Sequence, residues 1–225
     1  MKNIKKRKLF IKLAILGNIL YMIGDWLLDA KLPDNVTNGF VESSWAEMSM
    51  WRFEVSIWLG ALGTCLSFLG LCTVARLVMK QVKKPGQIMM FGAIVGSLGT
   101  FFIHSTCCLL PILWKVSYSI NYDVASAALL VNTTANYLIG PLCIFFVILD
   151  GCLSIPFIYV VLKGKLAVPK WAVLCNPLAT AVIGIILQLI PFYPIEAITG
   201  AFESLGHLLM CVLMLKFEKG NNKIE

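Results

Sequence analysis

The sequence predicts an all-α membrane protein, a single bundle of six transmembrane helices with both termini in the cytoplasm. The first observation is composition: 59% of the 225 residues are hydrophobic and 14% are charged, whereas about a quarter are charged in soluble domains. The second is that six apolar runs reach the length of about 20 residues that crosses a bilayer. They cover 9–29, 54–78, 87–113, 138–162, 171–191 and 198–217.

The distribution of lysine and arginine between these runs predicts the orientation. Basic residues cluster before the first run, between the second and third, between the fourth and fifth, and after the sixth. The clusters are Lys5, Lys6, Arg7 and Lys8; Arg76, Lys80, Lys83 and Lys84; Lys163, Lys165 and Lys170; and Lys216, Lys219 and Lys223. Because such segments stay in the cytoplasm, we expect both termini inside. The net charge of +7 is spread over these clusters, so it reports orientation and does not indicate a nucleic-acid partner.

The first run is expected to remain in the protein as a helix. It follows a lysine-rich start, as a signal peptide would, but no small-residue cleavage site follows it and it continues to Asp29. The connections on the cytoplasmic side are only about seven to eight residues long. They leave no room for a soluble module, so residues 1–225 are predicted to form one transmembrane domain.

Local motifs refine the later runs. Glycines in 60–64 and in 92–100 have the small-residue spacing that lets the second and third helices pack closely. Residues 124–131, ahead of the fourth run, are predicted to form a short interfacial helix. The pair Asn176-Pro177 predicts a kink within the fifth run.

Five ionisable side chains lie inside the runs, where a charge costs about 2.5–3.5 kcal/mol on insertion scales. They are Asp25, His104, Asp150, Glu203 and His207, accompanied by the neutral Gln188. A rise of about 1.5 Å per residue places Asp25, His104, Glu203 and Gln188 at a similar depth in the outer half, and Asp150 and His207 near the midplane. Glu203 and His207 are four residues apart and share a helix face.

These depths predict an outward-facing polar pocket in the membrane. Asp25, His104, Glu203 and His207 would line it as catalytic residues. Asp150 and Gln188 would form its floor or wall, and Arg52 would stand at its mouth; these three are the expected substrate-binding residues.

Three acids cannot be neutralised by two histidines through ordinary ion pairs, which leaves three kinds of chemistry open. A protonated acid beside a histidine suits acid/base catalysis on a lipid- or isoprenoid-like substrate. A set of His104, His207, Asp25 and Glu203 suits a divalent metal such as zinc, iron or manganese, although no HExxH or HxxxH motif occurs. A hydrated site suits a path for protons or small cations. Each histidine also has a purely structural alternative, an interhelical hydrogen bond.

We therefore expect an intramembrane enzyme that uses acid/base or metal-assisted chemistry. The alternatives are a small proton- or cation-coupled transporter and a non-catalytic sensor, immunity or accessory protein. The expected partners are the lipid bilayer and an amphiphilic small molecule or a cation. The ends of the chain, rich in lysine, isoleucine and asparagine, are typical of a bacterial protein, so the expected location is a bacterial cytoplasmic membrane.

Short motifs in the first half of the chain support the prediction of a small multi-pass membrane protein. They are Ile23-Gly-Asp-Trp-Leu-Leu28, Ser49-Met-Trp-Arg52 ahead of Gly60-Ala-Leu-Gly63, and His104 before Pro111. The chain resembles an uncharacterised family of small bacterial multi-pass membrane proteins with Gly-Asp in the first helix, Ser-x-x-Arg before the second and His in the third. The resemblance implies that Asp25, Arg52 and His104 belong together, and it implies no activity.

Overall fold

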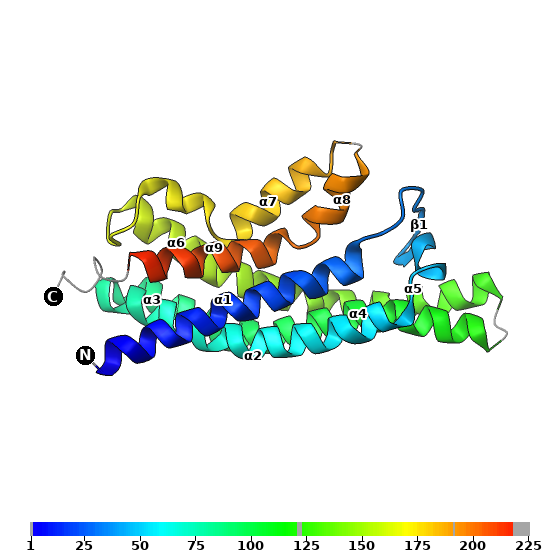
Figure 1. The fold of residues 1–225 in the computed structure, drawn as a ribbon, viewed down its shortest axis with the longest axis horizontal. Helices are drawn as coiled ribbons and strands as arrows, with labels where there is room; N and C mark the ends of the chain where they lie inside the picture. Colours follow the sequence, from blue (N-terminus) through cyan, green and yellow to red (C-terminus); the bar gives the residue numbers. More distant parts are fainter. Residues whose placement is uncertain (1, 121–122, 191, 218–225) are drawn as a thin grey trace.

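The computed structural model describes residues 2–120, 123–190 and 192–217, which form an elongated helical bundle (Figure 1). The all-α prediction is confirmed, apart from one hairpin of two-residue strands. The C-terminal lysines Lys219 and Lys223, which contributed to the predicted orientation, lie outside the described residues.

Four helices of the described chain are long and apolar enough to cross a membrane: Ile4–Asp29, Met50–Gln81, Lys83–Ser119 and Val124–Leu162. The first lies in α1 (Lys2–Asp29) and the second is α2 (Met50–Gln81). The third joins α3 (Lys83–Phe91), η2 (Gly92–Gly96) and α4 (Ser97–Ser119). The fourth joins α5 (Val124–Phe146), η3 (Val147–Gly151) and α6 (Cys152–Leu162). Both η2 and η3 are π-helical.

The predicted interfacial helix at 124–131 is wrong, because these residues are the first turns of α5. The carboxylate of Asp123 accepts a hydrogen bond from the backbone N–H of Ser126 and so caps the helix there. Pro141 does not end α5, since a neighbouring turn can absorb a proline in a membrane helix. The helix therefore begins well before the predicted boundary at 138.

The last two predicted runs are interrupted helices. Residues 171–191 divide into η4 (Lys170–Leu174) and α7 (Pro177–Leu187), and residues 198–217 divide between α8 (Tyr193–Thr199) and α9 (Phe202–Lys216). The predicted kink at Asn176-Pro177 is instead a helix start. Asn176 has an extended backbone, its side chain caps the N–H of Ala179, and Pro177 occupies the first turn, where its missing N–H costs nothing.

The outer connection after α1 is compact. It contains β1 (Thr37–Asn38), β2 (Val41–Glu42) and η1 (Ser43–Ala46). Glu42 accepts hydrogen bonds from Lys31 and Asn35, and Asn132 of α5 accepts one from the backbone N–H of Phe40. The hairpin is thus fastened to the segment that follows α1 and to α5.

Helix packing leaves two apolar clusters at different levels of the bundle. The inner cluster lies towards the first residues of α1 and the end of α9 and includes Ile11, Val74, Phe157 and Met214. The outer cluster includes Leu28, Trp45, Phe53 and Trp114. Between them lies a polar layer.

Two glycines show how closely the helices approach. A Cβ on Gly60 of α2 would collide with the ring of His104 on α4, which confirms the predicted packing of the second helix on the third. A Cβ on Gly96 would come within 2.7 Å of Leu149 in η3. The prediction was wrong for Gly96, whose missing side chain admits the fourth long helix instead of the second.

Candidate functional site

The polar layer is built from side chains that recur at helical spacing on four elements. In α1 they are Asn18, Tyr21 and Asp25; in α2, Ser56, Thr64 and Ser67; in α4, Ser97, Thr100 and His104; and in α9, Glu203, Ser204 and His207. Most of these side chains are three or four residues from the next, which keeps them on one helix face, whereas Glu203 and Ser204 are adjacent and point in different directions. Asp150 joins them from η3.

Asp25 and His104 form the centre of a first group, the closed cluster, which also includes Ser56 and Ser204. Nδ1 of His104 lies 3.3 Å from Oδ1 of Asp25. The hydroxyl of Ser204 donates to Oδ2 of Asp25 at 2.5 Å. The carboxylate therefore joins α1 to both α4 and α9.

The other ring nitrogen of His104 is a hydrogen-bond donor. Nε2 lies 2.9 Å from the backbone oxygen of Ser56 and 3.0 Å from that residue's hydroxyl. Because a carbonyl oxygen only accepts hydrogen bonds, Nε2 carries a proton. The contact between Nδ1 and Oδ1 of Asp25 needs a second proton, on the imidazole or on the carboxyl group, because an unprotonated Nδ1 and a carboxylate are both acceptors. The hydroxyl of Ser56 in turn donates to the carbonyl of Gly24 at 2.8 Å. Every polar side chain of the closed cluster thus has partners.

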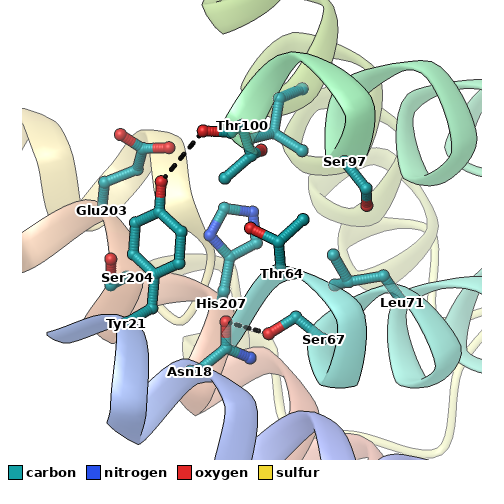
Figure 2. A pocket seen from close by; sticks show the side chains of 11 residues that line it. Asn18, Tyr21, Thr64, Ser67, Leu71, Ser97, Thr100, Glu203, Ser204 and His207 are labelled. Atoms are coloured by element: carbon teal, nitrogen blue, oxygen red, sulfur yellow. Dashed lines mark hydrogen bonds between the residues drawn. The ribbon is translucent and has the colours of Figure 1, made fainter. Parts of the chain in front are cut away.

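Smaller hydrogen bonds continue the layer on the same helices. Ser67 donates to Oδ1 of Asn18 at 3.0 Å, and the hydroxyl of Tyr21 donates to the backbone oxygen of Thr100 at 3.2 Å (Figure 2). The ring of Tyr21 also lies 4.7 Å, centroid to centroid, from that of His104. Tyr21 therefore lies between the closed cluster and the cavity described below.

Asp150, Glu203 and His207 form a second group, the open cluster. One ligand-type atom from each lies within 4.8 Å of the others. Nε2 of His207 is 3.9 Å from Oδ1 of Asp150, which is too long for a hydrogen bond. Within the described part of the chain, the two carboxylate oxygens of Asp150 and Nε2 of His207 have no hydrogen-bond partner, although these residues are only 1% and 6% exposed.

Interruptions of the α-helical pattern place two of these three side chains. Asp150 lies in the π-helical η3, and such segments are frequent at functional sites because they redirect a side chain. Glu203 lies in the first turn of α9, just after the break that separates α9 from α8. A carboxylate is favoured there by the partial positive charge of the helix N-terminus.

A small cavity opens between the helices beside this cluster. Its volume is about 20 Å³, enough for one water molecule or one ion. Figure 2 shows the imidazole of His207 among side chains from α1, α2 and α4, with Glu203 and Tyr21 next to each other. The hydroxyl of Thr64, which also lines the cavity, is buried and has no hydrogen-bond partner in residues 2–120, 123–190 and 192–217.

Arg52 and Gln188 lie apart from this cavity. Arg52 donates from Nε to the carbonyl of Leu27 at 3.0 Å and from Nη2 to that of Ala30 at 2.8 Å, so it caps the end of α1. Gln188 donates to the hydroxyl of Thr199 at 3.1 Å. It lines a separate outer cavity of about 430 Å³ with Asp29 and Lys31.

The structure thus divides the seven predicted site residues among several places. Asp25 and His104 meet in the closed cluster, while Asp150, Glu203 and His207 meet in the open one; Arg52 and Gln188 occupy neither. Sequence reasoning missed the hydroxyl-bearing residues Tyr21, Thr64 and Ser97. Their spacing on the same faces as Asp25, Gly60 and His104 was the available signal.

The fold and site together define an all-helical protein with four helices able to cross a membrane and ionisable side chains buried among them. The model of a protein family of unknown function, DUF6796, matches residues 1–219, and the chain belongs to that family. The resemblance to an uncharacterised family is confirmed at that level. Neither a curated protein nor a solved structure matches the chain.

Proposed function

We propose that this protein is an intramembrane enzyme that acts on the polar end of a lipid- or isoprenoid-like molecule. In this proposal the open cluster supplies the reacting groups, and the hydrocarbon part of the substrate stays at the lipid-facing surface. The observation that carries the proposal is a wall shared by the polar cavity and an apolar groove.

The groove lies between α2 and the η2–α4 segment and has a volume of about 480 Å³. Its lining is mainly apolar and includes Ala61, Phe68, Leu98 and Phe101. Phe68, Leu98 and Phe101 are exposed large hydrophobic side chains on two of the helices that can cross a membrane. The groove would therefore face acyl chains, and its apolar lining suits a hydrocarbon chain.

Thr64 and Ser97 line both the groove and the polar cavity. Two small hydroxyl side chains are thus all that the two linings have in common. A chain lying in the groove would bring its polar end to this wall, with His207 and Glu203 on the other side. Entry from the lipid would then need no opening to water.

The open cluster suits proton transfer. A carboxyl group and an imidazole with an unused ring nitrogen can accept and donate protons at one substrate atom. The cavity has room for one water, which hydrolysis would use as the second reactant and which an isomerisation would not require. Tyr21 and the hydroxyl of Thr64 would orient the polar end of the substrate.

The inner apolar cluster favours an enzyme over a transporter. Towards the inner end, the polar layer is followed by Val74, Leu153, Phe157 and Met210, each fully buried. The buried side chain of Asn176 is occupied in capping α7 and in a hydrogen bond to the backbone oxygen of Val173. A proton or cation would have to cross an apolar layer beyond the site.

The proposed topology has six crossings with both termini in the cytoplasm of a bacterium. The chain runs the length of the bundle four times in its long helices. It then crosses through η4 and α7 and returns through α8 and α9, whose end lies at the same end of the bundle as the start of α1 (Figure 1). Lysines at that end support the orientation. Interrupted crossing helices often carry the binding residues of membrane proteins.

The first experiment tests the groove with a phospholipid that carries a photoactivatable diazirine in its acyl chain. In nanodiscs containing this probe, we expect cross-links concentrated on 61–68 and 94–101. Ala61→Trp should fill the groove and reduce them several-fold, whereas Leu62→Trp, on an exposed side chain of the same helix, should not. Labelling spread evenly over all exposed helix faces would overturn the proposed groove.

The second experiment tests catalysis. Purified protein is incubated with a bacterial total lipid extract containing polyprenyl phosphates, and lipids are measured by mass spectrometry over time. We expect one species to be converted, and Glu203→Gln to slow the conversion at least about 100-fold, the smaller effect of losing a general acid or base. Glu54→Gln, on an exposed residue, is the matched control.

Two results would contradict the catalytic proposal. One is equal conversion by the wild type and Glu203→Gln. The other is no conversion by the wild type together with Glu203-dependent proton uptake into proteoliposomes, which would make the protein a transporter.

A further inference from the structure

We propose that Asp150, Glu203 and His207 together bind one divalent transition-metal ion, of the class of Zn²⁺, Mn²⁺ or Fe²⁺. The inference names a cofactor for the open cluster and rests on the proposed function only for the metal's chemical role. It differs from the ligand set expected from the sequence, because Asp150 replaces Asp25 and His104.

The donor set fits such an ion. An imidazole nitrogen and two carboxylate oxygens are normal ligands for zinc, iron and manganese. The three candidate atoms lie within 4.8 Å of one another. Ligand atoms about 2.1 Å from a tetrahedral ion lie about 3.4 Å from one another. Side-chain rotations that move the three candidate atoms by roughly an ångström would bring them to that spacing.

His207 presents a lone pair to the proposed ion. Its Nε2 has no hydrogen-bond partner among the described residues. Metal-binding histidines commonly carry their proton on the other ring nitrogen, which a backbone carbonyl or a carboxylate holds. With the proton on Nδ1, Nε2 is an unprotonated acceptor 3.9 Å from Oδ1 of Asp150.

Two acceptors therefore face each other in the protein interior with no donor between them. An unpartnered buried carboxylate is among the costliest groups in a protein. Both oxygens of Asp150 and Nε2 of His207 lack partners among the described residues. A cation between these atoms would satisfy them together, and a divalent ion would balance the two carboxylates of Asp150 and Glu203.

The fourth coordination position would face the small cavity. Three protein ligands and one open position are typical of catalytic metal sites, whereas structural sites are closed by four. The cavity of about 20 Å³ has room for one water. A metal there would supply an activated water beside Thr64 and Ser97, where the polar end of the substrate is proposed to arrive.

The test uses the full-length chain in detergent, stripped with a chelator and dialysed against Zn²⁺ or Co²⁺. We expect about one metal per chain by elemental mass spectrometry and, with Co²⁺, visible absorption bands of low-symmetry coordination. His207→Gln and Glu203→Gln should each weaken Co²⁺ binding at least about tenfold. His104→Gln, which changes the chain's other histidine, should leave the stoichiometry unchanged.

Folding is checked by size exclusion and by thermal unfolding with and without Zn²⁺. Zn²⁺ should raise the unfolding temperature of the wild type and of His104→Gln but not of His207→Gln. The proposal is overturned if the stripped wild type takes up no metal, or if His207→Gln binds it as tightly as the wild type.

The two proposals fail separately. If no metal binds but Glu203→Gln still abolishes lipid conversion, the metal site is wrong and acid/base catalysis stands. If one metal binds through His207 but no lipid is converted and none enters the groove, the metal site stands and the proposed function falls.

Discussion

Asp25 and Asp150 are both carboxylates within one polar layer, but their surroundings differ. Asp25 is bound by His104 and Ser204. Asp150 is more deeply buried, and both its oxygens lack hydrogen-bond partners among the residues that the structure describes. Satisfied polar groups specify how helices pack. Unsatisfied ones cost stability and persist where something else uses them. On the proposed function, the closed cluster has a structural role and the open cluster a chemical one.

The largest expected effect is on the closed cluster. Asp25→Leu removes one partner of a buried pair and leaves His104 and Ser204 unsatisfied. We expect it to lower the free energy of unfolding by about 3 kcal/mol, the lower end for breaking such a pair, since side chains in a membrane find other partners even when unfolded. Thermal or denaturant unfolding in detergent measures this. An unchanged stability would remove the structural role assigned to Asp25.

The same kind of substitution in the open cluster should have the opposite effect on the free energy of unfolding. Asp150→Leu removes a carboxylate that has lost its hydration without gaining a hydrogen bond. We expect the metal-free protein to be as stable as the wild type or up to about 2 kcal/mol more stable, while lipid conversion is lost. A destabilisation as large as that of Asp25→Leu would show that the two clusters do not differ as proposed.

The position of His104 gives a smaller, steric test. Gly60→Ala places a methyl group where the imidazole lies, so the ring or the helix must shift. We expect a loss of about 1–3 kcal/mol, as for other overpacked sites. Gly140→Ala, where no heavy atom lies within 4 Å of the added Cβ, is the control and should change stability little. Equal effects of the two substitutions would refute close packing at Gly60.

The smallest effect is expected at the hairpin formed by β1 and β2. Burial alone would raise the pKa of Glu42, but hydrogen bonds from Asn35, Lys31 and Thr37 outweigh it and lower that pKa below its usual 4.5. A depressed pKa means that the stabilisation is present above the unfolded pKa and is lost as pH falls through the folded one. Below about pH 4.5, amide exchange in 31–44, corrected for its intrinsic pH dependence, should rise in the wild type and show a smaller pH response in Glu42→Gln. An identical pH response would remove this role.

The apolar runs and their helical conformation were predictable, because a run of about 20 apolar residues has few alternatives to a helix in a membrane. The interruptions at 175–176 and 200–201 were not. The Asn176-Pro177 pair indicated an irregularity, but a kink and a new helix start have the same sequence signature. Which one forms depends on whether Asn176 can reach the N–H of Ala179.

By itself, the sequence determined which residues needed an explanation: three acids and two histidines in apolar runs, with Glu203 and His207 on one face. Tertiary structure decided how they are grouped. Successive residues on a helix point about 100° apart, so Ser204 faces Asp25 of α1 while Glu203 joins Asp150 of η3. The level of a residue along its helix can be counted from the sequence, but its neighbours on other helices are set only when the helices pack. Helix packing therefore separated the carboxylate that has hydrogen-bond partners from the one that lacks them among the described residues.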